Sequence, residues 1–425
     1  MSDPQRVLPQ VTVENEFYWQ AGAEGVLRFQ QCNDCKGLIH PPQPICNHCR
    51  SRELSIVDVS GVGRLIGFTH NVRFGLPGIV PPYTIAHVAI AEDDRVRVTT
   101  RIVDAEVEDL AIGQEMRVVF EHVEDIWFPL FTPTDNTELT DLPLDEVEPE
   151  KMHTLVRPPL TASRFEQDSA VTGIGMSRIG RRQMVNPLSL TVDAALAAIH
   201  DAGLTVDDID GLSTYPGGGM AGMGEGGVTA LEAALRIRPS WYNGGAETFG
   251  PSGSIIAAMM AVSTGLARHV LCFRTVWQST YEVEVANGRF GGGGGRIGSP
   301  MDYILPFGAT SAAHTLGMMA QRHMHKYGTT KETLGTIAIN QRRNASLNPT
   351  AIYRDVITMD DYMNARPITK PFGLLDCDVP CDASVAIIIS AVDAARDLKH
   401  KPIRFEAVGT QLIERKEWDQ STLTH

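Results

Sequence analysis

The chain has 425 residues, a formal net charge of −14, and 43% hydrophobic against 21% charged residues. This composition is typical of a globular protein of two or three domains and excludes a fibrous or disordered chain. The acidic balance argues against nucleic acid or an anionic membrane surface as the main partner. Apolar runs are all shorter than the roughly 18–20 residues that cross a bilayer, so we expect no membrane span.

The first predicted elements lead into four cysteines. Residues 14–30 carry aromatic and apolar residues at near-helical spacing and precede Cys32, Cys35, Cys46 and Cys49, which form CNDC, ten residues, and CNHC. Two C-x2-C turns on neighbouring loops can hold one zinc ion in a tetrahedron of thiolates. Two disulfides or four separate thiols are the alternatives. The start, MSDPQRVLPQ, lacks the apolar segment of a signal peptide, so we expect a cytoplasmic protein with reduced thiols and a structural zinc ion.

Short alternating apolar runs follow from about residue 54. They are rich in Val, Ile, Thr and Phe, are broken by Gly, Pro and Asp-Asp turns, and predict a small antiparallel sheet or barrel. The next stretch, TPTDNTELTDLPLDEVEPEK, is acidic and contains proline, which indicates an exposed linker. We therefore divide the chain into a domain at 1–133, a linker at 134–166 and a second domain at 167–425.

The second domain alternates strands and helices. AVTGIGMS predicts a buried strand, LSLTVDAALAAIHDAG a helix that ends at a glycine, HVLCFRTV a strand, and ASVAIIISA another buried strand. Helical patterns lie between these strands, SGSIIAAMMAVSTGLA and TSAAHTLGMMAQRHMHKYG among them. Alternation of this kind predicts an α/β layer structure around a central sheet.

Two resemblances follow from these segments. LRFQQCNDCKGLIHPPQPICNHC, SGVGRLIGFT and FPLFTP resemble the rubredoxin-type zinc ribbon and OB fold that accompany thiolase-like proteins. From about residue 168, GIGMSRIGRR, INQRRNASLNPTA and DDYMNARPITKPFGLLDCDVP resemble the lipid-transfer (sterol-carrier) branch of the thiolase superfamily. The implied fold is an N-terminal zinc ribbon with an OB-fold barrel, then the first half of a thiolase-like α/β fold. The second half of that fold is absent from these residues, so we expect either a fragment or a second chain that supplies it.

The thiolase resemblance also concerns the catalytic residue. In thiolases a cysteine before a helix is the nucleophile, and in this chain Gly250 stands at that position, in NGGAETFGPSGSIIAAMM. The resemblance thus implies chemistry without an acyl-cysteine intermediate. The hydroxyl of Ser252 is suited either to cap the helix that follows or to act as a nucleophile. Glu247, Ser252 and His314 are our candidates for catalysis, and the general base stays open.

A glycine run offers a candidate for cofactor binding. Glycines 291–295 lie between Arg289 and Arg296. Their backbone N–H groups can cradle a phosphate of coenzyme A, with the two arginines nearby. The alternative is a flexible surface loop, because no strand leads into the run.

Lipid-transfer thiolases that lack the nucleophile and carry a zinc-OB module resemble aldolases that shorten steroid or terpenoid side chains. The resemblance implies a lyase that splits a β-hydroxyacyl-CoA into a ketone and a short acyl-CoA by a retro-aldol reaction, once the missing half is supplied. The alternative is a non-catalytic acyl-CoA-binding or scaffolding partner of a complete thiolase-fold protein. We expect acyl-CoA as ligand, and either a homo-oligomer or a thiolase-fold partner chain.

Overall fold

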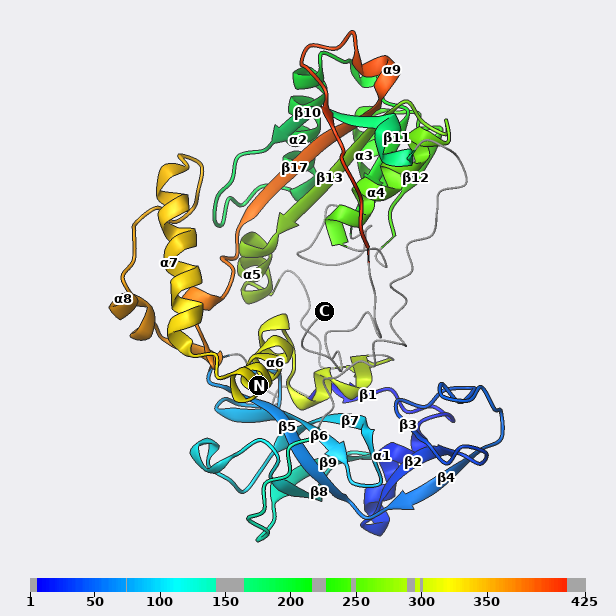
Figure 1. Cartoon of the computed structure of the whole chain (residues 1–425), viewed down its shortest axis with the longest axis vertical. Helices are drawn as coiled ribbons and strands as arrows, with labels where there is room; N and C mark the ends of the chain where they lie inside the picture. The colour runs from blue at the N-terminus through cyan, green and yellow to red at the C-terminus, as the bar shows by residue number, and fades with distance from the viewer. Residues whose placement is uncertain are drawn as a thin grey trace.

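The computed structural model describes residues 6–73, 75–142, 164–215, 227–245, 250–288, 295–298 and 301–410. In Figure 1 they form two lobes, with a barrel and its attached ribbon at the bottom and an α/β sheet at the top. A helical segment in yellow and orange, between strands β13 and β17, connects the two lobes. Within the described ranges, every helix is too short or too polar to cross a membrane.

A three-stranded ribbon opens the fold. Its elements are α1 (Glu16–Gln20), the 3₁₀ turn η1 (Ala21–Glu24), β2 (Leu27–Cys32), β3 (Leu38–Ile39) and β4 (Leu54–Val59). The strands are antiparallel in the order β3-β2-β4. Helical structure stops at Gly25, which has a left-handed φ of +73° and whose N–H closes the turn on Ala21 and Gly22. The helical spacing seen over residues 14–30 therefore corresponds to helix only as far as residue 24.

Five strands form the barrel: β5 (Val62–Asn71), β6 (Tyr83–Ile90), β7 (Asp93–Ile102), β8 (Glu115–Val123) and β9 (Ile126–Pro133). Neighbours are antiparallel except β7 and β9, which meet in parallel at Ile102 and Phe131. Strand β5 also pairs with β8, so the sheet closes in the order β5-β6-β7-β9-β8. A five-stranded barrel with this strand order is the architecture of an OB fold.

Aromatic rings fill the seam between ribbon and barrel. Trp19 of α1 is completely buried and stacks on the rings of Tyr303 and Phe307, with centroids 5.3 and 6.2 Å away. Phe128 of β9 meets both Trp19 and Phe307 edge to face. Tyr303 and Phe307 come from far along the chain, so the core of this lobe is not built from residues 1–133 alone.

The upper lobe holds a six-stranded sheet: β10 (Ser169–Met176), β11 (Gly211–Thr214), β12 (Trp241–Asn243), β13 (His269–Trp277), β17 (Asp382–Ala391) and β18 (Ile403–Arg404). The strand order is β12-β11-β13-β17-β10-β18. Strands β12, β11 and β13 are parallel, and β17 runs antiparallel to both β13 and β10. The expected α/β sheet is therefore present.

Helices pack on both faces of this sheet. Helix α2 (Pro187–Ala202) packs on one face, against Leu271 and Phe273 of β13. Helix α4 (Gly250–Ser263) packs on the other face, against Val270 and Cys272, the alternate residues of the same strand. Shorter helices complete the lobe: α3 (Gly227–Leu235), α5 (Gln278–Ala286) and α9 (Val392–Ala395).

Two glycines allow β10 to approach α2 closely. A Cβ atom placed at Gly173 would lie 2.4 Å from the Ala198 carbonyl oxygen, and one at Gly175 would lie 2.2 Å from that of Ala194. Neither distance is possible for a real side chain. The close packing of β10 on α2 therefore requires glycine at both positions.

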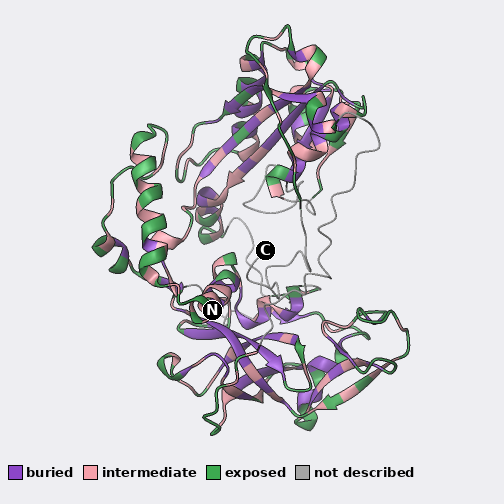
Figure 2. Cartoon of the chain, in the orientation of Figure 1, coloured by how far each residue is buried: buried purple, intermediate pink, exposed green. Residues whose placement is uncertain are grey.

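The segment between β13 and β17 packs on the barrel. Its elements are η6 (Met301–Tyr303), η7 (Leu305–Phe307), α6 (Ala312–Tyr327), α7 (Lys331–Leu347), α8 (Met359–Met363), β15 (Pro367–Lys370) and β16 (Phe372–Gly373). Strand β15 pairs antiparallel with β5, and α6 lies across β5 and β6. Strand β6 is buried along its whole length, whereas α7 buries only Gly335 (Figure 2).

Polar contacts fix this segment on the barrel. The Thr69 and Thr369 hydroxyl oxygens lie 2.6 Å apart, and the Tyr83 hydroxyl donates to the Gly308 carbonyl at 3.0 Å. Further along, β14 (Arg296–Ile297) pairs with β1 (Leu8–Pro9) near the start of the chain.

The division of the chain at residues 133 and 167 stays a prediction. Of the proposed linker, only residues 134–142 and 164–166 lie within the described ranges. The return of residues 301–373 to the barrel was not apparent from the sequence, because it depends on contacts between segments more than 200 residues apart.

Candidate functional site

The four ribbon cysteines meet at one point. Their sulfur atoms all lie within 4.8 Å of one another, with 3.5 Å between Cys32 and Cys49 and 3.6 Å between Cys35 and Cys46. All four are free thiols. Zinc–sulfur bonds of about 2.3 Å in a tetrahedron place the sulfurs about 3.8 Å apart, so the cluster fits a zinc ion.

Both C-x2-C turns have the same backbone geometry. In the first, the Lys36 N–H donates to the Cys32 carbonyl at 3.0 Å, and in the second the Arg50 N–H donates to the Cys46 carbonyl at 2.9 Å. Lys36 and Arg50 have left-handed φ angles of 62° and 65°. The repeated turn aims each pair of sulfurs at the same centre, and a zinc ion held there has no open coordination position.

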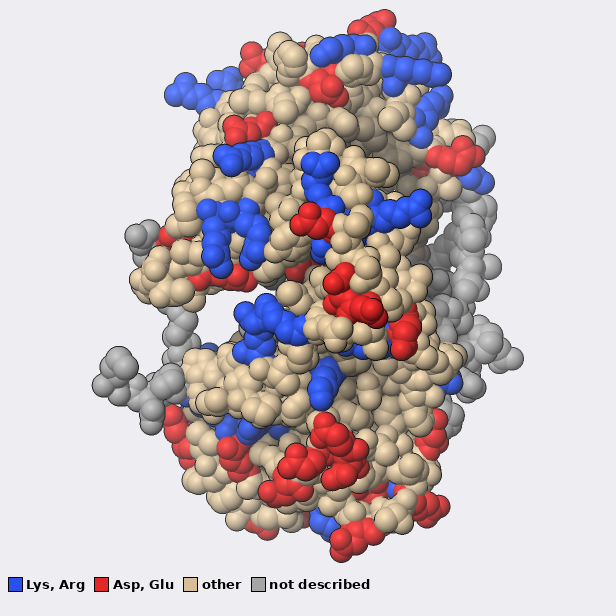
Figure 3. Space-filling view, turned by 90° about the vertical axis from the view of Figure 1, so that its left-hand side faces the viewer, with Lys and Arg blue, Asp and Glu red and all other residues tan. Residues whose placement is uncertain are grey.

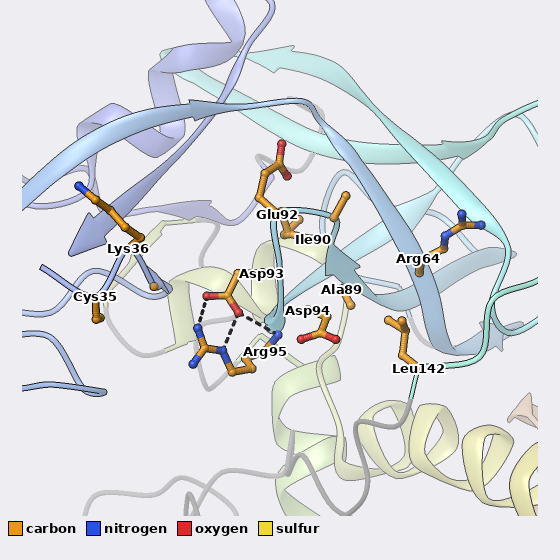
Figure 4. Close-up of a pocket in the computed structure, with 12 residues that line it drawn as sticks. Cys35, Lys36, Arg64, Ala89, Ile90, Glu92, Asp93, Asp94, Arg95 and Leu142 are labelled. Atoms are coloured by element: carbon orange, nitrogen blue, oxygen red, sulfur yellow. Dashed lines mark hydrogen bonds and ion pairs between the residues drawn. The ribbon is translucent and has the colours of Figure 1, made fainter. Parts of the chain in front are cut away.

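A pocket of about 600 Å³ opens between the first cysteine turn and the barrel. Figure 4 shows the residues that line it, among them Cys35 and Lys36 of the ribbon and Asp93 and Arg95 from the β6–β7 hairpin. Several of its charged groups already have protein partners: Arg95 pairs with Asp93, and Arg64 pairs with Glu115 at 3.3 Å. From the sequence, Asp93-Asp94-Arg95 indicated only a turn, so its contact with the ribbon was missed.

Gly250, at the position of the thiolase cysteine by resemblance, is the first residue of α4. Its φ is +67°, and a Cβ atom placed there would meet no other atom within 4 Å. The site thus has room for a side chain, but its left-handed backbone favours glycine. The thiol of Cys272 lies under the same helix, 3.9 Å from the Ser254 carbonyl, and complete burial raises its pKa well above the ordinary value.

Ser252 lies in the first turn of α4, exposed, so it is not the N-cap residue of that helix. Among the described residues its hydroxyl has no hydrogen-bond partner, and its role in catalysis stays a prediction. Glu247 and Arg289 lie outside the described residues, as do glycines 291–294.

His314 is completely buried in the first turn of α6. Its Nδ1 accepts the N–H groups of Thr310 and Ser311 at 3.1 and 3.2 Å, and burial lowers its pKa to about 4. The ring is therefore neutral with its proton on Nε2, an atom that has no hydrogen-bond partner in the described structure. Because Nδ1 is occupied, His314 can donate a hydrogen bond from Nε2 but is poorly placed as a base.

Arg296 has structural contacts. Its guanidinium pairs with Asp125, lies 3.7 Å from Glu124, and donates to the Pro9 carbonyl at 3.1 Å. These contacts hold β14 beside β1 and the β8–β9 turn. A role for Arg296 in binding coenzyme A stays a prediction.

Charged side chains on one face are distributed unevenly between the lobes. On the face shown in Figure 3, acidic residues gather toward the barrel end and basic residues are more frequent toward the α/β end. The two signs are interspersed between these ends.

Comparison with known proteins gives two family matches for the ribbon and barrel, and relatives that cover more than half of the chain. Residues 19–55 match the rubredoxin-like zinc ribbon domain of ChsH2, and residues 56–121 match the C-terminal OB-fold domain of ChsH2. A steroid side-chain-cleaving aldolase of Thermomonospora curvata is 35% identical over 244 residues, 55% of this chain and 59% of that protein. A 17-hydroxy-3-oxo-4-pregnene-20-carboxyl-CoA lyase of Mycobacterium tuberculosis is 32% identical over 56% of this chain and 61% of its own length.

The chain thus spans about three fifths of the length of these two relatives. A DUF35 domain-containing scaffold protein of Methanocaldococcus jannaschii is 30% identical over 99 residues, 22% of this chain and 67% of that protein. The expected zinc ribbon and OB-fold barrel are confirmed, as is the α/β sheet expected for the second part. The chain belongs to the family of DUF35 domain-containing proteins, and it joins the zinc ribbon and OB fold of ChsH2 to an α/β part similar to steroid side-chain-cleaving aldolases.

Proposed function

We propose that this protein is part of an aldolase that cleaves a carbon–carbon bond of a β-hydroxyacyl-CoA and releases a ketone and a shorter acyl-CoA. The observation that carries the proposal is the union, in one chain, of a ChsH2-type ribbon and barrel with a part similar to a side-chain-cleaving aldolase. The second relative is a lyase of a steroid carboxyl-CoA ester, which supports a coenzyme A thioester with a bulky ring system as substrate.

Retro-aldol cleavage needs no covalent bond to the enzyme. A base removes the proton of the β-hydroxyl, the bond between Cα and Cβ breaks, and its electron pair passes into the enolate of the thioester. Cβ becomes the ketone carbon, and Cα then takes a proton. Gly250 at the start of α4 is consistent with this route, because it offers no thiol for an acyl-enzyme.

The described residues limit the roles of the candidates. His314 is completely buried and its Nδ1 already accepts two N–H groups, which suits it to fixing the start of α6 rather than to contact with the substrate. Ser252 is exposed at the start of α4, where an incoming substrate can reach it. Neither is placed to act as the base, because Ser252 is a hydroxyl and the Nδ1 of His314 is occupied, so we assign the base to Glu247 or to a partner chain.

A partner is part of the proposal because one face of the α/β sheet is incompletely covered. Ile174 and Met176 of β10 and Val385 of β17 are 63%, 51% and 45% exposed. Met176 and Val385 are direct partners across the two strands, so they form one patch. We propose that a second thiolase-fold chain, or another copy of this one, covers it.

The test is product analysis with the protein in its native assembly. A β-hydroxyacyl-CoA with a tertiary β-carbon should give ketone and shortened acyl-CoA in equal amounts, without added free coenzyme A. In D2O the new acyl-CoA should carry one deuterium at Cα. Release that requires free coenzyme A would indicate thiolysis instead and would overturn the proposal.

A scaffolding function is the second candidate. It is favoured by the scaffold protein of M. jannaschii, of which this chain covers 67%. In that case the protein binds a thiolase-fold enzyme, and the enzyme's activity depends on the complex. A partner whose cleavage rate falls without this chain, and is fully restored by this chain carrying Glu247→Gln and Ser252→Ala, would favour scaffolding over catalysis.

A further inference from the structure

The hairpin between β6 and β7 contacts both cysteine turns of the ribbon. Asp93, at the start of β7, is almost fully buried, with 7% of its side chain exposed. Its Oδ2 accepts the N–H of Leu38, which directly follows the first cysteine turn, at 3.0 Å. Asp93 thus connects the barrel to the backbone of the ribbon.

Arg95 completes this contact. Its Nε and Nη2 donate to the two oxygens of Asp93, each at 2.7 Å, in a bidentate pair. Its Nη1 lies 3.4 Å from Nδ1 of His48, the residue between the cysteines of the second turn. The Arg95 side chain is 56% exposed, and the two bonds to buried Asp93 orient its guanidinium beside the ribbon.

Gly37 shows how near this guanidinium is to the sulfurs. A Cβ atom placed on Gly37 would lie 3.0 Å from the His48 ring, 3.3 Å from Nη2 of Arg95 and 3.5 Å from the Cys35 sulfur. The three groups therefore surround one Cα atom. A larger residue than glycine at position 37 would push the guanidinium away from Cys35.

The charges of the metal centre and of Arg95 indicate how this contact affects zinc binding. Four thiolates with one Zn²⁺ carry a net charge of −2, and a fixed cation beside them lowers the energy of the loaded site. We propose that Asp93 and Arg95 are positioning residues of the metal centre: Asp93 fixes Arg95, and Arg95 neutralises part of the thiolate charge and slows the loss of zinc. The pocket in Figure 4 is then the seam of this contact rather than a substrate site.

The test measures zinc release from the purified full chain into a chromogenic chelator. Groups that support metal ligands typically change metal affinity by about 10–100-fold. We expect Arg95→Gln to release zinc about tenfold faster than the unchanged protein, Asp93→Asn to do nearly the same, and Arg95→Lys to fall between. Arg117→Gln, an exposed arginine of β8, is the matched control and should release zinc at the original rate.

A second measurement separates this effect from general unfolding. Cobalt(II) in a tetrahedral four-sulfur site gives a characteristic charge-transfer spectrum, which should be unchanged in Arg95→Gln if the site still forms. A normal spectrum with faster release supports the proposal. Release at the original rate from Arg95→Gln, or a release rate equally raised in Arg117→Gln, would overturn it.

Discussion

The two sheets of the molecule differ in how completely the described residues cover them. The barrel is closed on itself, α6 covers its outer surface along β5 and β6, and β15 extends the sheet beside β5. The α/β sheet has α2 on one face, but on the other face Ile174 and Met176 remain exposed beside α4. The barrel lobe therefore needs no further chain for its core, whereas the α/β lobe has a surface suited to a partner.

The barrel lobe is better covered because its core includes residues from outside the barrel strands. The barrel core includes Tyr303 and Phe307, which belong to the segment between β13 and β17. The α/β lobe thus contributes residues to the barrel lobe while its own sheet stays partly open. We therefore expect the two lobes to respond differently to mutation.

Cys46→Ala should have the largest effect. Loss of one of four ligands abolishes tetrahedral zinc binding, and structural zinc contributes about 10–16 kcal/mol to small domains of this kind. The ribbon should unfold, and residues 301–307 should lose protection because Tyr303 packs against Tyr18 and His40 of this region. Hydrogen exchange read by mass spectrometry should show strands β10 and β13 still protected. Cys377→Ala, outside the cluster, is the control and should keep one zinc per chain.

Phe307→Ala should destabilise the barrel lobe by about 3–5 kcal/mol, as expected for a completely buried phenylalanine. The loss should appear in urea unfolding followed by tryptophan fluorescence, since Trp19 lies against the Phe307 ring. Leu347→Ala, at a side chain 80% exposed, should stay within about 0.5 kcal/mol. Equal effects of the two changes would show that the segment does not share the barrel core.

Ile174→Lys with Val385→Lys should weaken assembly without unfolding the chain. Both side chains are exposed in the described structure, so two charges there cost little in the isolated chain but are buried unpaired in an interface. Light scattering should show a shift toward a single chain of 46.4 kDa. Leu196→Lys, exposed on α2, should leave the assembly intact. If the double variant assembles like the unchanged protein, this face is not the interface.

Gly250→Ala should have the smallest effect, a loss of about 1 kcal/mol. Nothing lies within 4 Å of the added methyl group, so the cost comes from the left-handed φ of +67° alone. Gly409→Ala also meets open space and has no left-handed φ, and its melting temperature should not change. A stabilising effect of alanine at Gly250 would show that the turn before α4 does not require glycine.

Much of the fold was predictable from the sequence for local reasons. The C-x2-C spacing determines the turn geometry, and the period-two runs and the alternation of strands with helices follow from local residue pattern. The pairing of β15 with β5 was not predictable, because PITK is too short to identify its partner strand.

Prediction of the candidate site was more limited. The spacing of the cysteines predicted which four sulfurs lie together, whereas Asp93 and Arg95 gave no signal because their contacts depend on where the hairpin meets the ribbon. For His314, a candidate for catalysis, the sequence could not show that the side chain is completely buried or that backbone N–H groups occupy its Nδ1.

The central claim is carbon–carbon cleavage by a thiolase-like chain without a covalent intermediate. The most direct test is intact-protein mass spectrometry of the assembly, quenched in acid while it turns over a β-hydroxyacyl-CoA. We expect ketone and shortened acyl-CoA in solution and an unmodified mass for this chain. An acyl adduct that forms and decays at the rate of product release, on Ser252 or on any cysteine, would contradict it.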